Sequence, residues 1–334
     1  MRTSEFCLRA DIDSFSAGFS FILRICEWEL VAIFVAALVL SFPSVLLAQT
    51  KPASFNDRAK GARTASSDSL VSILTARGLL GNTADSNSSA IEPPSGTEVD
   101  ETIQTAKQDG KKISHTREWT EKLNSNALHI ELTSFPGKQS QVAFWVLPDQ
   151  SQGCLMFGRT MFDANGRPLH SEFWRNDRQL KITGAADFPP DLYPEALPAV
   201  ALLRVVDFSR QGAKGKIDQQ VSPYGFVDQQ VTVKESDDVQ VPAGRFEAVR
   251  VDSQPNVSSI LPSWPRFTLG VVSPFLPQTT YYFQAGPPHR LLRKEQAGTP
   301  FIGGPEAVTE LLRYYVAGTT ASNSPTHQLK GSTG

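Results

Sequence analysis

The sequence predicts a mainly β protein, folded as a curved antiparallel sheet or half-open β-barrel with two apolar helical inserts on its concave side. Three observations support this prediction. Between residues 113 and 317, short segments alternate apolar and polar residues with a period of two, as half-buried strands do. Short polar turns join successive segments, which favours antiparallel neighbours. Two longer apolar segments, at residues 195–208 and 258–276, interrupt the alternation.

The predicted strands are recognised by this alternation and by their turns. Leu128, Ile130 and Leu132 share one face of a strand, and the residues between them are polar or ionisable. An Asn165-Gly166 pair tolerates the positive φ angles of a tight turn and predicts a hairpin. The strands expected on this basis lie at residues 128–133, 141–147, 154–162, 169–174, 179–183, 227–233, 246–252, 279–284, 290–296 and 308–316.

The first insert, residues 195–208, is apolar nearly all round and longer than a typical strand. Pro194 suits the first position of a helix, so we expect a buried helix there. Prolines punctuate the second insert, residues 258–276, and prevent one regular helix, so we expect short helical turns.

The large apolar side chains of the second insert have three interpretations. They fill the concave side of the sheet, they line or gate an apolar pocket, or they contact a membrane surface. The segment has one basic residue, Arg266, which argues against strong membrane binding. The candidate ligand-binding residues are Leu261, Trp264, Phe267, Phe275 and Leu276.

The N-terminal region has the layout of a secretory signal peptide. An uncharged apolar run from Leu30 to Leu40 is followed by small and helix-breaking residues, with cleavage expected after Ala48. Residues 30–48 are also just long enough for an uncleaved membrane anchor, which we consider the weaker alternative. Both predict an exported protein, and cleavage predicts a periplasmic or secreted one.

The regions that flank the strands are polar. Residues 49–112 are rich in serine and chain breakers and predict a disordered linker, and residues 318–334 predict a disordered tail. The sequence therefore predicts a signal peptide at residues 1–48 and one β-rich domain at residues 113–317.

Composition excludes several classes of function. Acidic and basic residues nearly cancel, 34 against 32, so no single-sign field draws nucleic acid or anionic lipid to the chain. Cys154 lies in an apolar run and is expected to be a buried, unreactive thiol. The common serine-hydrolase, zincin, P-loop and C-x-x-C motifs are missing from the sequence. We therefore expect no cofactor and assign no catalytic residue.

The strongest chemical pattern is a repeated His-x-Glu, at His129/Glu131 and His170/Glu172. A spacing of two places both side chains of a pair on one face of a strand. If the two strands were neighbours, two imidazoles and two carboxylates would form a set suited to zinc. The competing interpretation, which we favour, is that these are the water-facing positions of half-buried strands.

One region carries a family resemblance. The run Val241-Pro242-Ala243-Gly244-Arg245-Phe246-Glu247-Ala248-Val249-Arg250-Val251 is followed by Thr280-Tyr281-Tyr282-Phe283 and by Pro288-His289-Arg290-Leu291-Leu292-Arg293. With its V-P-A-G-x-F hairpin, this region resembles a bacterial envelope family known as a domain of unknown function. That family is similar in fold to the periplasmic lipoprotein carriers, whose incomplete β-barrel covers helices. The resemblance covers roughly residues 140–316, and it implies a fold and an envelope location without catalytic residues.

Together these observations favour an exported non-enzymatic envelope protein. Its half-barrel is expected to bind an apolar ligand, such as a lipid or acyl chain, or to dock an envelope protein partner. Two alternatives remain: a metal-dependent hydrolase built on the His-x-Glu strands, and a purely structural module whose concavity is filled.

Overall fold

The computed structural model describes residues 69–80, 91–149, 151–176, 191–194, 196–222, 225–256, 276, 278–297 and 306–319. All of them belong to one compact unit, Asn56–Gly334. The predicted signal peptide, the first part of the predicted linker, the strand expected at residues 179–183 and nearly all of the second apolar insert lie outside the described residues. Among the described residues, no helix combines the length and the apolar character needed to cross a membrane.

The described residues form one antiparallel sheet of twelve strands, so the predicted β class is confirmed. Its order is β6-β5-β4-β3-β2-β1-β12-β11-β10-β9-β8-β7, which is two consecutive meanders joined where β1 pairs with β12. The strands are β1 (Glu98–Ala106), β2 (Lys112–Leu123), β3 (Asn126–Ser134), β4 (Ser140–Pro148), β5 (Met156–Phe162), β6 (Pro168–Arg175), β7 (Lys214–Ser222), β8 (Gly225–Val241), β9 (Gly244–Pro255), β10 (Thr279–Gln284), β11 (Leu291–Gln296) and β12 (Ala307–Val316).

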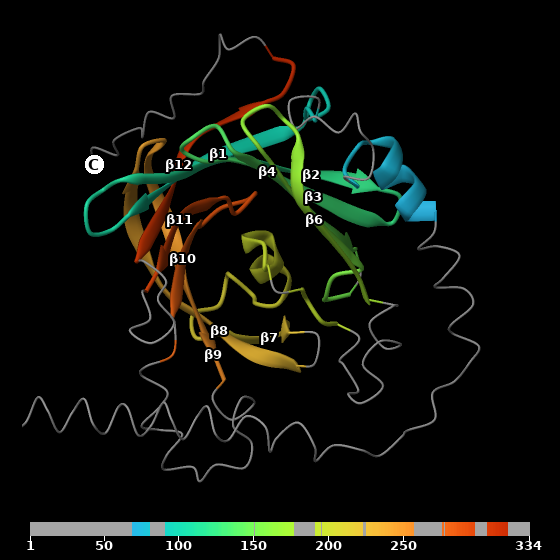
Figure 1. The fold of residues 1–334 in the computed structure, drawn as a ribbon. Coiled ribbons are helices and arrows are strands. Elements are labelled where there is room, and N and C mark those ends of the chain that lie inside the picture. The colour runs from blue at the N-terminus through green and yellow to red at the C-terminus, as the bar shows by residue number, and fades with distance from the viewer. Residues whose placement is uncertain are drawn as a thin grey trace, which may run out of the picture. The chain divides into compact units, whose positions relative to one another are not determined.

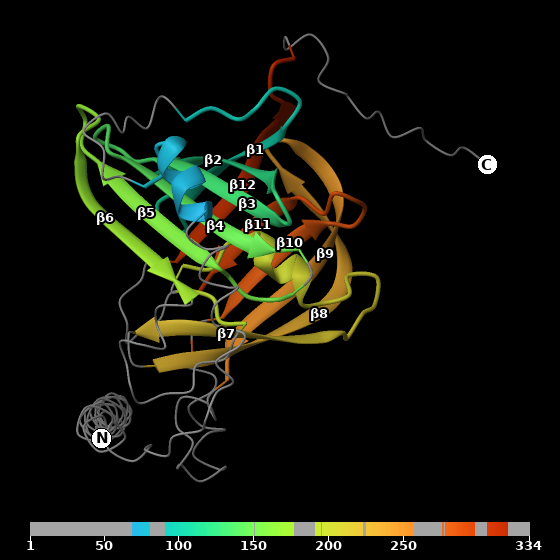
Figure 2. The same ribbon diagram turned by 90° about the vertical axis from the view of Figure 1, so that its right-hand side faces the viewer.

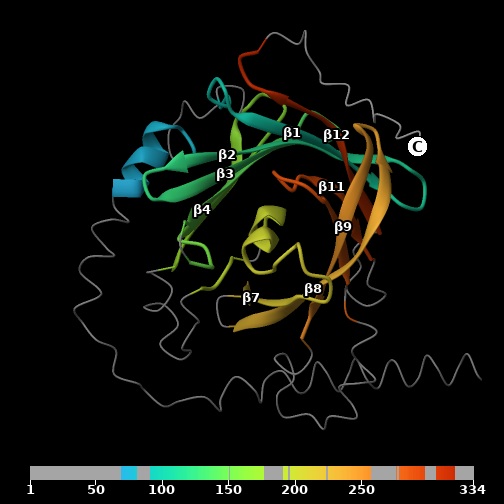
Figure 3. The ribbon, with the colours of Figure 1, turned by 180° about the vertical axis from the view of Figure 1, so that it is seen from behind.

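The sheet curls around a short 3₁₀-helix, η2 (Ala199–Arg204), which lies inside the curve in Figure 1 and, from behind, in Figure 3. We call the side of the sheet that faces η2 concave and the other side convex. Strand pairing leaves the sheet open between β6 and β7. A short segment bridges part of this gap: Tyr193 pairs in parallel with Gln219 of β7, and the carbonyl of Leu192 accepts a hydrogen bond from the Cys154 amide.

The convex side of β1 to β5 is apolar and covered by a helix at residues 69–76. Leu70 and Leu74 of this helix are buried, at 3 % and 0 % exposure, in a cluster with residues of the sheet. The cluster's other buried members include Val99, Trp119, Leu128, Ile130, Leu132, Val142, Phe144 and Val146. Figure 2 shows the helix lying against this side of the sheet.

The sheet begins earlier than the sequence predicted. Strand β1 and the helix at residues 69–76 both lie within residues 49–112, the segment whose polar composition predicted a disordered linker. The composition of β1 is polar because one side of this strand borders cavities. Its alternate residues, Glu98, Asp100, Thr102 and Gln104, line cavities on the concave side instead of a hydrophobic core.

The first apolar insert forms a much shorter helix than predicted. Its regular part is the six-residue η2, not a helix over residues 195–208. Pro198 precedes η2 with extended backbone, and Val205 ends it, because proline in a helix interior and β-branched residues disfavour longer helical runs. Ala201 and Leu202 are nonetheless fully buried against the concave side, as expected for an apolar insert.

Candidate functional site

The concave side of β1, β2 and β3 carries a row of carboxylates. Asp100 of β1 lies opposite Glu118 of β2, and Glu118 lies opposite Glu131 of β3. The row continues through Ala143 of β4 to Arg159 of β5. Like charges directly opposite each other destabilise a sheet. Three carboxylates in one row are therefore a feature that packing alone does not account for.

This row borders a cavity of about 790 Å³ between the sheet and η2. That volume lies within the range of about 300–1,000 Å³ typical of small-molecule sites. The cavity opens toward solvent at Arg77 and Glu98, whose side chains are 39 % and 58 % exposed. A second cavity of about 350 Å³ shares Glu118, Ala199 and Leu291 with the first.

The larger cavity has two chemically different walls. The apolar wall comes from η2 and from strands β10 and β11, through Ala199, Val200, Leu203, Phe283 and Leu291. The charged wall comes from β1 to β3 and the residue before β11, through Glu98, Asp100, Glu118, His129 and Arg290.

Arg290 is neutralised within this charged wall. Its Nε donates to Asp100 Oδ1 at 2.6 Å, and its Nη2 donates to Glu98 Oε2 at 2.6 Å. Its guanidinium also lies over the Tyr314 ring, 4.3 Å from the centroid. Burial raises the pKa of Asp100 to about 6, although the charge and hydrogen bond of Arg290 lower it. The charge of Arg290 is therefore balanced by Asp100 and Glu98, and Arg290 makes no ion pair with Glu118 or Glu131 among the described contacts.

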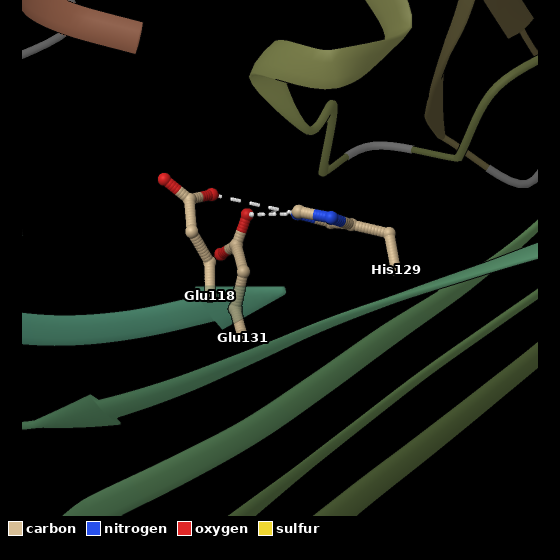
Figure 4. Close-up of side chains that lie close together, drawn as sticks. All are labelled: Glu118, His129 and Glu131. Atoms are coloured by element: carbon tan, nitrogen blue, oxygen red, sulfur yellow. Dashed lines mark hydrogen bonds and ion pairs between the residues drawn. The ribbon is translucent and has the colours of Figure 1, made fainter. Parts of the chain in front are cut away.

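Beside this row, the buried imidazole of His129 faces two of its carboxylates, Glu118 and Glu131 (Figure 4). His129 Nε2 lies 3.5 Å from Glu118 Oε2 and 3.4 Å from Glu131 Oε1. The other ring nitrogen, Nδ1, lies 3.0 Å from the Thr120 hydroxyl. The ring also packs 5.6 Å from the Trp145 ring, and His129 is only 3 % exposed. The imidazole is thus held from two sides, with Nε2 directed at both carboxylates.

The electrostatic environment of His129 favours a positive charge. Burial by itself lowers the pKa of the imidazole, but hydrogen bonds and charges from Glu118 and Glu131 outweigh it and raise the pKa to about 9. Two carboxylates around one imidazole therefore attract a proton or another cation.

The alternative four-residue zinc set, which requires the two His-x-Glu strands to be neighbours, does not form. Strands β4 and β5 separate β3 from β6, so His129 and His170 lie on strands roughly 14 Å apart at ordinary strand spacing. His170 is exposed, and Glu172 pairs with Arg159 at 2.7 Å. The second His-x-Glu thus occupies a water-facing position, as our favoured interpretation expected. The same interpretation is wrong for His129, which is 3 % exposed because its side of the sheet is enclosed.

Glu118 is the site residue that sequence reasoning missed. It joins His129 and Glu131 because the two-residue turn Asn124-Ser125 sets the register of the β2–β3 hairpin. The signal in the sequence is Asn124, because asparagine tolerates the positive φ, 55°, that it adopts in this turn. Counting outward from such a turn in the sequence places Glu118 opposite Glu131.

Four of the predicted ligand-binding residues, Leu261, Trp264, Phe267 and Phe275, lie outside the described residues. The fifth, Leu276, is half-buried and lines neither of the two cavities.

The chain matches no protein-family model, and a search of curated proteins finds no match. Among solved structures, a protein described as exported, with a YmcC-like fold, from Bacteroides fragilis is 15 % identical; the match covers 66 % of this chain and 96 % of that one, with a TM-score of 0.27. A protein described as a lipoprotein from Parabacteroides distasonis is 13 % identical over 67 % of this chain and 97 % of that one, with a TM-score of 0.29.

A beta-barrel-like protein of the domain of unknown function DUF1849 from Brucella abortus is 6 % identical, over 68 % of this chain and 100 % of that one, with a TM-score of 0.39. At TM-scores below 0.5, these similarities assign neither a fold nor a function to this chain.

Proposed function

We propose that this protein is an exported, non-enzymatic binding protein of the bacterial envelope, and that its curled sheet holds an amphiphilic ligand, a lipid or acyl chain with a polar head. The observation that carries the proposal is the division of the 790 Å³ cavity into an apolar wall and a charged wall. Export is supported by the signal-peptide pattern at residues 30–48. A purely structural module would gain nothing from a row of carboxylates beside an open cavity.

The charged wall changes the kind of ligand expected from the sequence. A purely apolar ligand in this cavity would strip water from Glu118 and the Asp100–Arg290 pair without replacing their hydrogen bonds, which is costly. An acyl chain along Val200 and Leu203 of η2 gains about 0.8 kcal/mol for each buried methylene, and a polar head beside the carboxylates keeps them solvated. The two walls together therefore favour an amphiphile.

The test is uptake by the purified protein of a fluorescent monoacylglycerol, whose uncharged polar head is not repelled by the carboxylates of the charged wall. Leu203→Glu places a charge on the apolar wall and should weaken binding at least ~10-fold, since one misplaced charge costs more than 1.4 kcal/mol. Val200→Trp should also weaken binding, because the indole ring of the introduced tryptophan would occupy part of the cavity. Leu169→Glu is the matched control, because Leu169 is 58 % exposed on β6 and lines neither cavity. Equal uptake by all four proteins would exclude this cavity as the binding site.

We further propose that the second apolar insert contributes ligand contacts through Leu261, Trp264, Phe267 and Phe275. Trp264→Ala should then weaken uptake of the same monoacylglycerol, and unchanged uptake would remove this residue from the site. Native mass spectrometry of protein purified from its host separates ligand binding from partner docking. A co-purifying lipid supports the first, and a co-purifying protein with an empty cavity supports the second.

A further inference from the structure

We propose that Glu118, His129 and Glu131 form a binding site for a divalent metal ion, with Zn²⁺ as the best-suited ion, and with one coordination position open to the cavity. The three residues each offer one ligand atom, and these atoms all lie within 4.8 Å of one another. Imidazole nitrogen and carboxylate oxygen are both zinc ligands. This inference does not depend on the amphiphilic ligand proposed above.

The distances favour a metal over a bridging proton. A charged N–H···O⁻ hydrogen bond is about 2.7–2.9 Å long, and a proton on Nε2 would draw one carboxylate to that distance. Nε2 instead lies 3.4 Å from Glu131 Oε1 and 3.5 Å from Glu118 Oε2, nearly equidistant from both. Ligand atoms bound tetrahedrally to zinc at ~2.0–2.1 Å are separated by about 3.3–3.4 Å. The gap between imidazole and carboxylates therefore has the dimensions of a zinc site.

The surroundings of His129 orient it as a metal ligand. The Thr120 hydroxyl lies 3.0 Å from Nδ1 and can accept the Nδ1–H of the tautomer whose Nε2 lone pair faces the carboxylates. Ligand histidines commonly make such a bond through their second nitrogen. The imidazole ring also packs against the Trp145 ring and is only 3 % exposed, so its neighbours hold it in this orientation before any metal binds.

Charge and access complete the argument. Two carboxylates and a neutral imidazole carry a charge of −2, which Zn²⁺ balances. Glu118 lines both cavities, so the space beside it is connected to solvent. Three protein ligands and an open fourth position are typical of zinc sites that exchange water or bind a further donor. An anionic or neutral oxygen donor in the cavity is the class of ligand that such a position takes.

The experiment measures zinc retained by the untagged chain. The protein is stripped with a chelator, incubated with ZnCl₂ alone and separated from free metal by gel filtration, and zinc per chain is then determined by elemental analysis. We expect one zinc per chain, and a loss of affinity of at least ~100-fold in His129→Ala because this substitution removes the imidazole ligand. His170→Ala removes the exposed histidine of the second His-x-Glu and should bind zinc like the unmodified protein.

Two conservative variants cover the case in which His129→Ala does not fold. Glu131→Gln keeps the shape of the side chain, and Thr120→Val removes only the hydroxyl that orients the imidazole. Each should lower zinc affinity by roughly 10–100-fold. Thr116→Val is the control for the latter, since it removes a hydroxyl from the same two strands that lies 3.0 Å from the Thr133 hydroxyl and not against the imidazole. The proposal is overturned if the unmodified chain retains no zinc. It is also overturned if Glu131→Gln and Thr120→Val both bind zinc as tightly as the unmodified chain does.

Discussion

Replacing Leu74 with alanine tests whether residues 69–80 belong to the folded domain. Leu74 is 0 % exposed and packs in the cluster on the convex side of the sheet. The substitution removes three carbon atoms from this cluster, worth about 2 kcal/mol of transfer free energy at ~0.8 kcal/mol per methylene. The cavity left behind adds to this loss, and buried Leu→Ala substitutions cost about 2.7–5 kcal/mol in all. We expect a loss of about 3 kcal/mol, near the lower limit, because a surface helix can partly relax into the space.

Urea unfolding followed by tryptophan fluorescence measures the effect. The midpoint should fall while the dependence of the free energy on urea stays unchanged, and the melting temperature should fall by roughly 6–12 °C. Thr75→Ala is the control, since Thr75 is exposed one residue further along the same helix, and surface substitutions usually change stability by less than ~0.5 kcal/mol. If Leu74→Ala and Thr75→Ala unfold together with the unmodified protein, the helix does not pack on the sheet, and the segment is a linker.

Three further predictions concern the sheet. Gly158→Ala should lower the free energy of unfolding by about 1–3 kcal/mol in a urea titration, because a Cβ there would lie 2.2 Å from Cε1 of the fully buried Phe144. Cys154, 1 % exposed and with a pKa raised by burial, should resist thiol reagents in the native state and react in denaturant, as a colorimetric thiol assay would show. Burial raises the pKa of Glu101, but hydrogen bonds to Arg313 and neighbouring charges outweigh burial and lower the pKa. The ionised Glu101 should therefore stabilise the fold fully above the unfolded pKa of about 4.5, and this stabilisation should be lost as the pH falls through the folded pKa. Glu101→Gln should therefore flatten the acid side of the stability curve measured by thermal melts.

The strands were predictable because their alternation is a local property. The β3 pattern of Leu128, Ile130 and Leu132 and the exact span of β10, residues 279–284, follow from periodicity alone. The antiparallel order of neighbouring strands followed from short turns. Pairing of β1 with β12 joins residues about two hundred positions apart, and no local pattern in a single sequence specifies such a contact.

The apolar run from Leu70 to Leu74 is compatible with a helical turn, but its packing on the sheet was not predicted, for a different reason. Its buried side chains, Leu70 and Leu74, form too short an apolar run to fold alone, and isolated helices of this length are unstable in water. The convex side of the sheet supplies the missing partner surface. A prediction from composition considers each segment alone and therefore predicts disorder for residues 49–112. Part of that range is nevertheless ordered because it packs against apolar residues elsewhere in the chain.

The sequence pattern identified His129 and Glu131 as a pair but did not show that they belong to an enclosed site with Glu118. The reason is that the sequence does not show which side of the sheet is enclosed. In most half-buried sheets, the polar positions face bulk water and the apolar ones face the interior, and His129/Glu131 was interpreted in that way. Here the apolar positions of β2 and β3 face a helix on the convex side, so the polar positions point into the curl, where His129 is 3 % exposed. In this partly enclosed place, two carboxylates beside one imidazole attract a proton or another cation. The period-two pattern thus reveals which residues share a face, but only the curvature of the sheet decides that this face encloses a site.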